Sequence, residues 1–275
     1  MPERVERKAF GEGLVQLNQH TVEMAGLAQR AVRMAVDSLV HRNDDRAKEV
    51  FLLDREIYRL QRAVEGECTD LIALFAPVAR DLRTVMTVLK ISTDIDRIGR
   101  GARNIAEIAL ELSQVGQKPP KLDKISRNAD LAIHMVDQSV RAFVEGNDRT
   151  VREMGRFDDE VDALYREIFH DVLTGLSERS IKPEVGVRLV LINRHIERIA
   201  DHAVNIANRV VYLVSGEAPP PVSRMVNGEP TAPVGAGADP NAPPTDPAPG
   251  AAPGSGGPRL DDGPADPGKP AGKPE

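Results

Sequence analysis

The 275-residue sequence has no tryptophan and few aromatic residues of any kind, with three Tyr and six Phe. Proteins that bind single-stranded nucleic acid use aromatic side chains on which the bases stack, and those that bind duplexes carry a surplus of basic residues. Residues 1–217 contain 32 Lys and Arg against 35 Asp and Glu, and residues 218–275 contain 4 against 7. Neither composition favours nucleic-acid binding.

Cysteine and long apolar runs are also scarce. Cys68 is the only cysteine in the sequence, which excludes an internal disulfide and a zinc site built from several cysteines. The helical pattern around it favours a structural or idle thiol. No run approaches the roughly 20 apolar residues that a membrane-spanning helix needs, and the charged residues at 1–8 are not typical of a signal peptide. We therefore expect a cytoplasmic protein.

Proline is rare in the first 217 residues and abundant after them. Sixteen of the 21 prolines lie in residues 218–275, together with ten glycines and no aromatic residue. Such a segment cannot bury enough apolar surface to offset the entropy of ordering, so we predict a disordered tail. Two interpretations of the tail stay open, a solvated segment without a specific role and a polyproline-type segment that docks on a partner.

In residues 1–217 the apolar residues recur at helical spacing and do not alternate as in strands. Turn and cap residues interrupt this pattern five times, which predicts an all-α fold. The six expected helices lie near residues 10–41, 44–74, 79–114, 121–145, 148–175 and 183–215. Several have about 30 residues and a length of roughly 45 Å. Long helices joined by short turns are typical of antiparallel bundles.

The sequence contains an internal duplication. Residues 96–106 (DRIGRGARNIA) recur 101 positions later as residues 197–207 (ERIADHAVNIA), with six identities in eleven positions. Residues 40–60 match residues 144–164 at an offset of 104. The change of offset places a three-residue length difference in the turn between the second and third helices of each copy, where insertions are tolerated. We predict two repeats of three helices each.

The second copy of the motif carries a candidate metal site. Glu197, Asp201 and Asn205 are four residues apart and form one stripe on the last helix, roughly opposite its apolar seam. Carboxylate and amide oxygens suit hard or borderline metal ions, and His195 and His202 lie beside the stripe. The alternative is a solvated charged face, because Arg194 and Arg198 each precede an acidic residue by three positions.

The first copy differs where the second carries its second acid. Asp96 is equivalent to Glu197, but Arg100 stands in place of an acid equivalent to Asp201. At this spacing Asp96 and Arg100 can form an ion pair, so Arg100 supplies the positive charge that a metal ion would bring.

Two further acids occupy equivalent apolar surroundings. Asp54 and Asp158 lie in the second helix of each repeat, and buried acids need partners. We expect Arg97 to pair with Asp54, and Arg198 with Asp158.

Familiar catalytic motifs are missing. The chain has a single Glu-x-x-His, at residues 167–170, whereas a ferritin-like di-iron site needs two and further Glu residues. It has neither a Gly-rich phosphate-binding loop nor Gly-x-Ser-x-Gly. Familiar nucleotide and hydrolase chemistries therefore find no support in the sequence.

The segment 75–99 (FAPVARDLRTVMTVLKISTDIDRIG) together with residues 196–207 resembles the PhoU family. The resemblance covers residues from about 10 to 216. It implies a first three-helix repeat over residues 1–116 and a second over 117–217, and the tail over 218–275 lies beyond it.

For this family the resemblance implies metal binding at two acidic motifs, frequent dimerisation and a cytoplasmic regulatory role without enzymatic activity. By position, Glu197, Asp201 and Asn205 form the intact metal motif. Asp96 retains the first acid of the other motif, whose site Arg100 puts in doubt. The metal would be iron, manganese, zinc or magnesium. The partners implied are the ATPase subunit of the phosphate ABC transporter and a phosphate-sensing histidine kinase, with a homodimer as the expected assembly.

Two other functions stay open. A helical adaptor that needs no metal and has no phosphate role fits the same fold. A carboxylate metalloenzyme would require turnover of a redox or hydrolytic substrate, and the single Glu-x-x-His argues against it.

Overall fold

The computed structural model describes residues 2–115, 117, 119–147 and 151–217, and the two residue pairs 225–226 and 229–230. The chain divides into two compact units, Met1–Pro220 and Pro221–Glu275. Side chains are described from residue 7 onward, except those of residues 151–153 and of the second unit.

The first unit is all-α, as predicted. Its helices are α1 (Pro2–His41), α2 (Asp44–Phe75), α3 (Ala79–Gln114), α4 (Asp123–Glu145), α5 (Val151–Ser177) and α6 (Pro183–Ser215). The predicted ends agree closely with these bounds, except that α1 begins at Pro2 and not near residue 10. Proline is tolerated in the first turn of a helix, and the Glu and Arg residues that follow favour helix without needing an apolar face. The predicted start of α5 at residue 148 lies outside the described residues.

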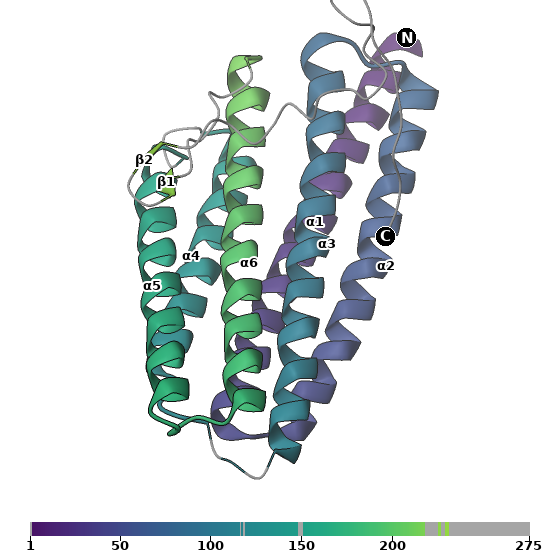
Figure 1. Cartoon of the computed structure of the whole chain (residues 1–275). Coiled ribbons are helices and arrows are strands. Elements are labelled where there is room, and N and C mark those ends of the chain that lie inside the picture. The colour runs from purple at the N-terminus through teal and green to yellow at the C-terminus, as the bar shows by residue number, and fades with distance from the viewer. Residues whose placement is uncertain are drawn as a thin grey trace, which may run out of the picture. The chain divides into compact units, whose positions relative to one another are not determined.

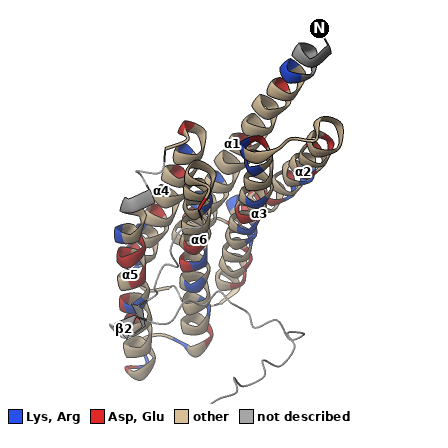
Figure 2. Cartoon of the chain, turned by 90° about the horizontal axis from the view of Figure 1, so that it is seen from above, with Lys and Arg blue, Asp and Glu red and all other residues tan. Residues whose placement is uncertain are grey.

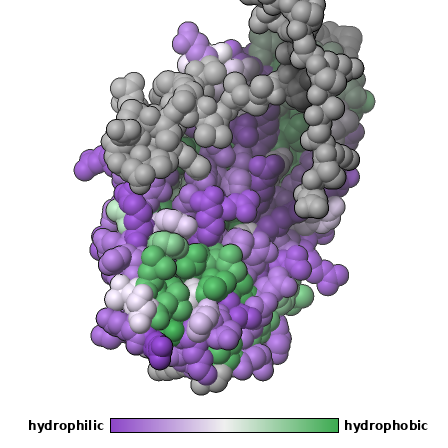
Figure 3. Space-filling view, in the orientation of Figure 1, coloured by the Kyte–Doolittle hydropathy of each residue, from purple (hydrophilic) through white to green (hydrophobic). Residues whose placement is uncertain are grey.

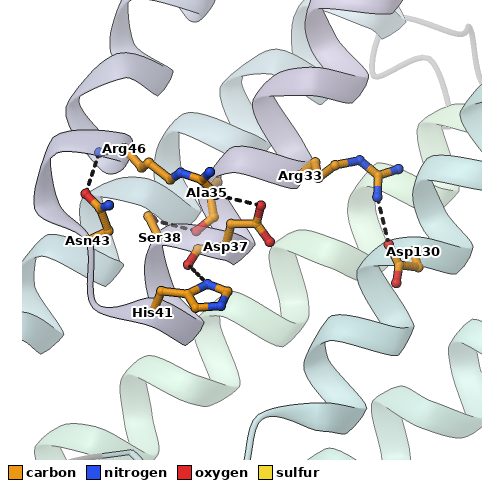
Figure 4. Close-up of polar contacts among 8 residues, drawn as sticks. All are labelled: Arg33, Ala35, Asp37, Ser38, His41, Asn43, Arg46 and Asp130. Atoms are coloured by element: carbon orange, nitrogen blue, oxygen red, sulfur yellow. Dashed lines mark hydrogen bonds and ion pairs between the residues drawn. The ribbon is translucent and has the colours of Figure 1, made fainter.

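Residue chemistry explains several helix ends. Asn43 caps α2 by accepting a hydrogen bond from the backbone N–H of Arg46 at 3.1 Å (Figure 4). Pro183 occupies the first turn of α6, where its missing N–H has no cost. Gly146 ends α4 at a φ of 61°, a left-handed conformation that glycine adopts without strain.

The six helices pack as two three-helix bundles, α1–α3 and α4–α6, joined by contacts of α3 with α6 and of α1 with α4 (Figure 1). The apolar core runs through both bundles, and its largest fully buried side chains include Leu17, Ile57, Ile95, Met135 and Ile196. Between α1 and α4, Arg33 donates to Asp130 at 3.4 Å across an exposed edge (Figure 4).

Helices α3 and α6 run antiparallel along the seam between the repeats. Glu111 near the end of α3 pairs with Arg188 near the start of α6 at 2.8 Å, while Asp94 pairs with Arg209 further along, also at 2.8 Å. The sequence predicted the two repeats but not which helices would join them.

None of the helices in the described part of the chain has the length and apolar character that a bilayer crossing requires. In the second unit, β1 (Met225–Val226) and β2 (Glu229–Pro230) pair antiparallel, with Met225 opposite Pro230. The sequence analysis did not predict this short pairing. The disorder predicted for the other residues of the tail concerns residues outside the described part.

Candidate functional site

The acid of the first repeat motif lies among α2 and α3 side chains. The Asp96 carboxylate is nearly buried and pairs with the Nε of Arg100 at 2.9 Å. This confirms the expected internal ion pair. Burial raises the pKa of Asp96, and the nearby carboxylate of Asp54 raises it further, whereas Arg100 lowers it. The second oxygen of Asp96, Oδ1, is buried without a hydrogen-bond partner.

Asp54 is also partly buried, but its partner is not the one expected. Its Oδ2 lies 3.9 Å from the Nε of Arg103, and Arg100 is close enough to lower its pKa, although burial has the larger effect and raises it. Arg97, the predicted partner, lines a pocket between α3 and α6 instead. The prediction was wrong because Arg97 and Arg103 project from different sides of α3, six residues apart.

In the second repeat, Glu197 is less exposed than a solvated face would make it. Only 12% of its side chain is accessible, and Arg194 pairs with its Oε1 at 2.7 Å. The other oxygen, Oε2, is also buried. One turn earlier on α6, Asn193 donates to the backbone oxygen of Tyr165 on α5 at 3.0 Å, so this part of α6 faces α5.

The rest of the predicted stripe turns gradually away from Glu197. Asp201 is partly buried and Asn205 is exposed. Asn205 lines a groove with Met86, Lys90 and other residues of α3 and α6. A straight helix makes 3.6 residues per turn, so residues four apart drift around the axis and the third member of a stripe faces a different neighbour.

The two histidines beside the stripe point to α3. The Nδ1 of His202 lies 3.1 Å from the Oδ1 of Asp94, and His195 lines the pocket that also contains Arg97. The prediction that they could add nitrogen ligands to the stripe is not supported by this orientation. Sequence spacing placed them beside the acids but could not show which neighbouring helix they face.

The acidic residues of the two repeats differ in how well they fit the metal site that the resemblance implies. In the first repeat the fit fails, because Arg100 and Arg103 already supply positive charge to Asp96 and Asp54. In the second repeat Glu197 and Asp201 are two carboxylates one turn apart, a donor set that suits a cation, although Arg194 pairs with Glu197. However, the described His, Cys, Asp and Glu side chains nowhere gather in groups of three or more that could hold a metal ion.

Asp94 is a functional candidate that sequence reasoning missed. Its side chain is only 2% exposed and receives both the Nε of Arg209 at 2.8 Å and the ring of His202 at 3.1 Å. All three residues lie on the α3–α6 seam. The sequence shows an acidic residue within an apolar stretch, which could have indicated a buried acid. It could not show the partners of Asp94, because they lie more than 100 positions away.

Cys68 is the structural thiol that its surroundings indicated. It is buried, and burial raises the pKa of the thiol to about 12. A thiol that stays protonated at neutral pH is a poor nucleophile and a poor metal ligand.

Fold and site together define a duplicated all-α protein in which the buried acids of the described residues serve ion pairs. The PhoU domain family matches residues 21–109 and 125–210, and the chain therefore belongs to the PhoU family.

Curated relatives match most of the chain. The phosphate-specific transport system accessory protein PhoU homolog of Synechocystis is 34% identical over 214 residues, covering 77% of this chain and 94% of the relative. The protein with the same name from Deinococcus radiodurans is also 34% identical and covers 76% and 98%.

Solved structures agree with the fold. PhoU from Pseudomonas aeruginosa superposes with a TM-score of 0.72 at 28% identity, covering 76% of this chain and all of that one. The phosphate transport system regulatory protein PhoU from Streptococcus pneumoniae gives a TM-score of 0.70 at 25% identity and covers 77% and 99%.

Proposed function

We propose that this protein is a negative regulator of phosphate uptake and of phosphate-starvation signalling. It acts in the cytoplasm by binding, without catalysis, and its partners are the ATPase subunit of a phosphate ABC transporter and a phosphate-sensing histidine kinase. The names of its relatives, accessory and regulatory proteins of phosphate transport, support the transport system as the partner. Family membership over both repeats supports the transfer of this role.

An exposed apolar patch on the second repeat carries the proposal that the chain acts by contact. Phe169 and Leu173 of α5 and Val187 and Leu191 of α6 are between 40% and 58% exposed. Figure 3 shows apolar side chains gathered over the lower parts of α5 and α6. A contiguous exposed apolar surface with a polar rim is typical of a protein-binding site.

The first repeat does not carry the same patch. The positions equivalent to Phe169, Leu173 and Leu191 are the polar residues Glu65, Thr69 and Lys90, at offsets of 104 and 101. Only Val187 has an apolar equivalent, Met86. Because both bundles have the same helices, folding alone does not require apolar side chains at these exposed positions. We therefore assign the patch to the docking of a component of the transport system.

The test is the complementation of a deletion strain that carries a phosphate-starvation reporter. Leu191→Asp should fail to restore repression of the reporter at high phosphate, while Leu52→Asp, at a position 63% exposed on α2, should restore it. Equal repression by both variants would contradict the docking role. A normal starvation response in the deletion strain itself would favour the alternative, a metal-independent adaptor with no phosphate role.

The same Leu191→Asp protein distinguishes the occupants of the patch. Binding to the purified ATPase subunit should be lost and the expected homodimer retained. If instead the dimer dissociates while binding of the ATPase subunit persists, the patch is the contact between two copies of the chain.

We also propose that a metal ion, if bound as in the resemblance, is held by Glu197 and Asp201 of the second repeat and not by Asp96. The sequence supports this choice, since only the second motif has two carboxylates one turn apart, whereas in the first Arg100 replaces the second acid and pairs with Asp96. A bound cation would neutralise the two carboxylates. Elemental analysis should find less metal in Asp201→Ala than in the unaltered protein, and an unchanged metal content would contradict the site.

A further inference from the structure

A pocket of about 170 Å³ lies between α3 and α6, on the seam that joins the two repeats. Its lining is basic and contains no carboxylate. The residues that line it are Arg97, Arg100, Gly101, Asn104, His195, Arg198, Ile199 and His202. Figure 2 shows Lys and Arg residues, in blue, at several places along α3 and α6.

The backbones of the two helices approach closely at this pocket. A Cβ atom added to Gly101 would lie 3.0 Å from the Cγ1 of Ile199 and 3.9 Å from the backbone oxygen of His195. Glycine is therefore the residue that permits this packing. The lining side chains come from two helices held at a fixed separation, so the pocket is largely pre-formed.

The positive charge of the pocket is only partly compensated. Arg100 is paired with Asp96 and His202 is bonded to Asp94. Within the described part of the chain, Arg97 and Arg198 form no ion pair. These two arginines occupy equivalent positions in the repeats, and the antiparallel seam brings them to the same pocket.

A difference between the repeats removes a carboxylate from this end of the seam. The residue equivalent to Asp94 in the second repeat is His195. Asp94 satisfies His202 and Arg209, whereas the second repeat places the imidazole of His195 in the pocket with Arg97 and Arg198. An imidazole can donate a hydrogen bond from a ring nitrogen.

We propose that this pocket binds a small tetrahedral oxyanion, and that the ligand is free inorganic phosphate. Guanidinium groups present paired N–H donors that match phosphate oxygens, and Arg97 and Arg198 supply two such groups. Asn104 and His195 add further hydrogen-bond donors. At about 170 Å³ the pocket is large enough for a small inorganic anion. This ligand site goes beyond regulation by protein contact and stands independently of it.

Calorimetric titration of the full chain with inorganic phosphate, in phosphate-free buffer, tests the proposal. Arg97→Gln/Arg198→Gln should weaken phosphate binding at least tenfold. Arg59→Gln, which removes an exposed arginine of α2 outside the pocket, should leave it unchanged. Phosphate binding that is absent in the unaltered protein, or equal in the double variant, would overturn the proposal.

Phosphoserine and sulfate complete the titration. Phosphate should bind more tightly than phosphoserine. If phosphoserine binds and phosphate does not, the ligand is a phosphorylated group and free phosphate is wrong. Binding only of sulfate would also overturn the assignment.

Nuclear magnetic resonance of the unaltered protein tests phosphate binding in the pocket even if the double variant does not fold. Phosphate should shift the imidazole signals of His195 and His202, which line the pocket, and leave that of the exposed His41 in place. Saturating phosphate without movement of the two pocket signals would overturn the proposal.

Discussion

At the scale of single residues, the buried polar groups of the α3–α6 seam are more consequential than the numerous surface ion pairs. Asp94 accepts hydrogen bonds from two side chains and is almost fully buried, whereas Asp45 and Lys48 form a pair whose side chains are 90% and 64% exposed. Exposed pairs contribute about 0–1 kcal/mol, because water screens them and ordering the side chains costs entropy. Removing one member of a buried pair leaves the other charge uncompensated.

Asp94→Ala should lower the free energy of unfolding by about 2–3 kcal/mol, since Arg209 and His202 lose their shared acceptor. The figure lies below the range of about 3–5 kcal/mol for buried pairs, because Arg209 is 32% exposed and can be rehydrated. Urea unfolding followed by circular dichroism measures the change. Asp45→Ala serves as the control and should differ from the unaltered protein by less than about 0.5 kcal/mol. Equal effects of the two substitutions would show that the buried pair contributes no more than an exposed one.

Asp96 predicts a pH dependence of stability. Burial raises its pKa above the ordinary value of 3.8, so the folded state binds this proton more tightly than the unfolded state. The stability from this linkage is fully present below pH 3.8 and is lost as the pH rises through the higher, folded-state pKa. An asparagine at this position does not titrate, so the Asp96→Asn protein does not lose this stability as the pH rises. Its unfolding free energy relative to the unaltered protein should therefore become more positive from acid to neutral pH.

Urea unfolding of both proteins over that pH range provides the measurement. The exposed Asp45→Asn should show a nearly constant difference from the unaltered protein. A pH-independent difference for Asp96→Asn would mean that Arg100 offsets the cost of burial completely.

At the scale of helices, two glycines distinguish the effect of helix propensity on stability from the effect of packing between helices. Gly66 lies on the exposed side of α2, with nothing within 4 Å of an added Cβ, whereas Gly101 lies against Ile199 on the seam. Gly66→Ala should raise the unfolding free energy by about 0.5–1 kcal/mol, because alanine loses less entropy in a helix. Gly101→Val should lower it by about 1–3 kcal/mol, because the larger side chain forces α3 and α6 apart. Thermal unfolding measures both, and a stabilised Gly101→Val protein would contradict the close packing.

The helices were predictable because their information is local. Apolar spacing, Asn43 as a cap and Pro183 in a first turn all lie within a few residues of the ends that they define. The ion-pair partners were less predictable. Asp96 and Arg100 are one turn apart on a single helix and were paired correctly. Asp54 pairs across two helices, and its choice of Arg103 over Arg97 depends on how α2 and α3 are rotated against each other.

At the scale of the whole molecule, the duplication predicted two similar bundles but not the surface that joins them. The α3–α6 seam brings Asp94 to Arg209 and Arg97 to Arg198, pairs that are at least 100 positions apart. Each half of the seam looks like an ordinary charged helix in the sequence, and the pocket exists only where the two meet. The two motifs thus diverged both in the acids that face their own bundles and in the residues that face each other.

The tail supplies the prediction at the largest scale. Met1–Pro220 forms a compact unit of its own, and every buried residue identified in the described part of the chain lies within it. A chain that ends at residue 220 should therefore retain its helical content and unfold within about 0.5 kcal/mol of the full chain, because an exposed terminal segment contributes little packing. Circular dichroism and urea unfolding of the two proteins test this expectation.

Comparing Gly66→Ala in both chains provides the control, since a substitution on α2 should stabilise each by the same amount. A marked loss of stability on truncation would show that residues 221–275 contribute to the fold, and would favour the docking-tail interpretation over that of a solvated segment.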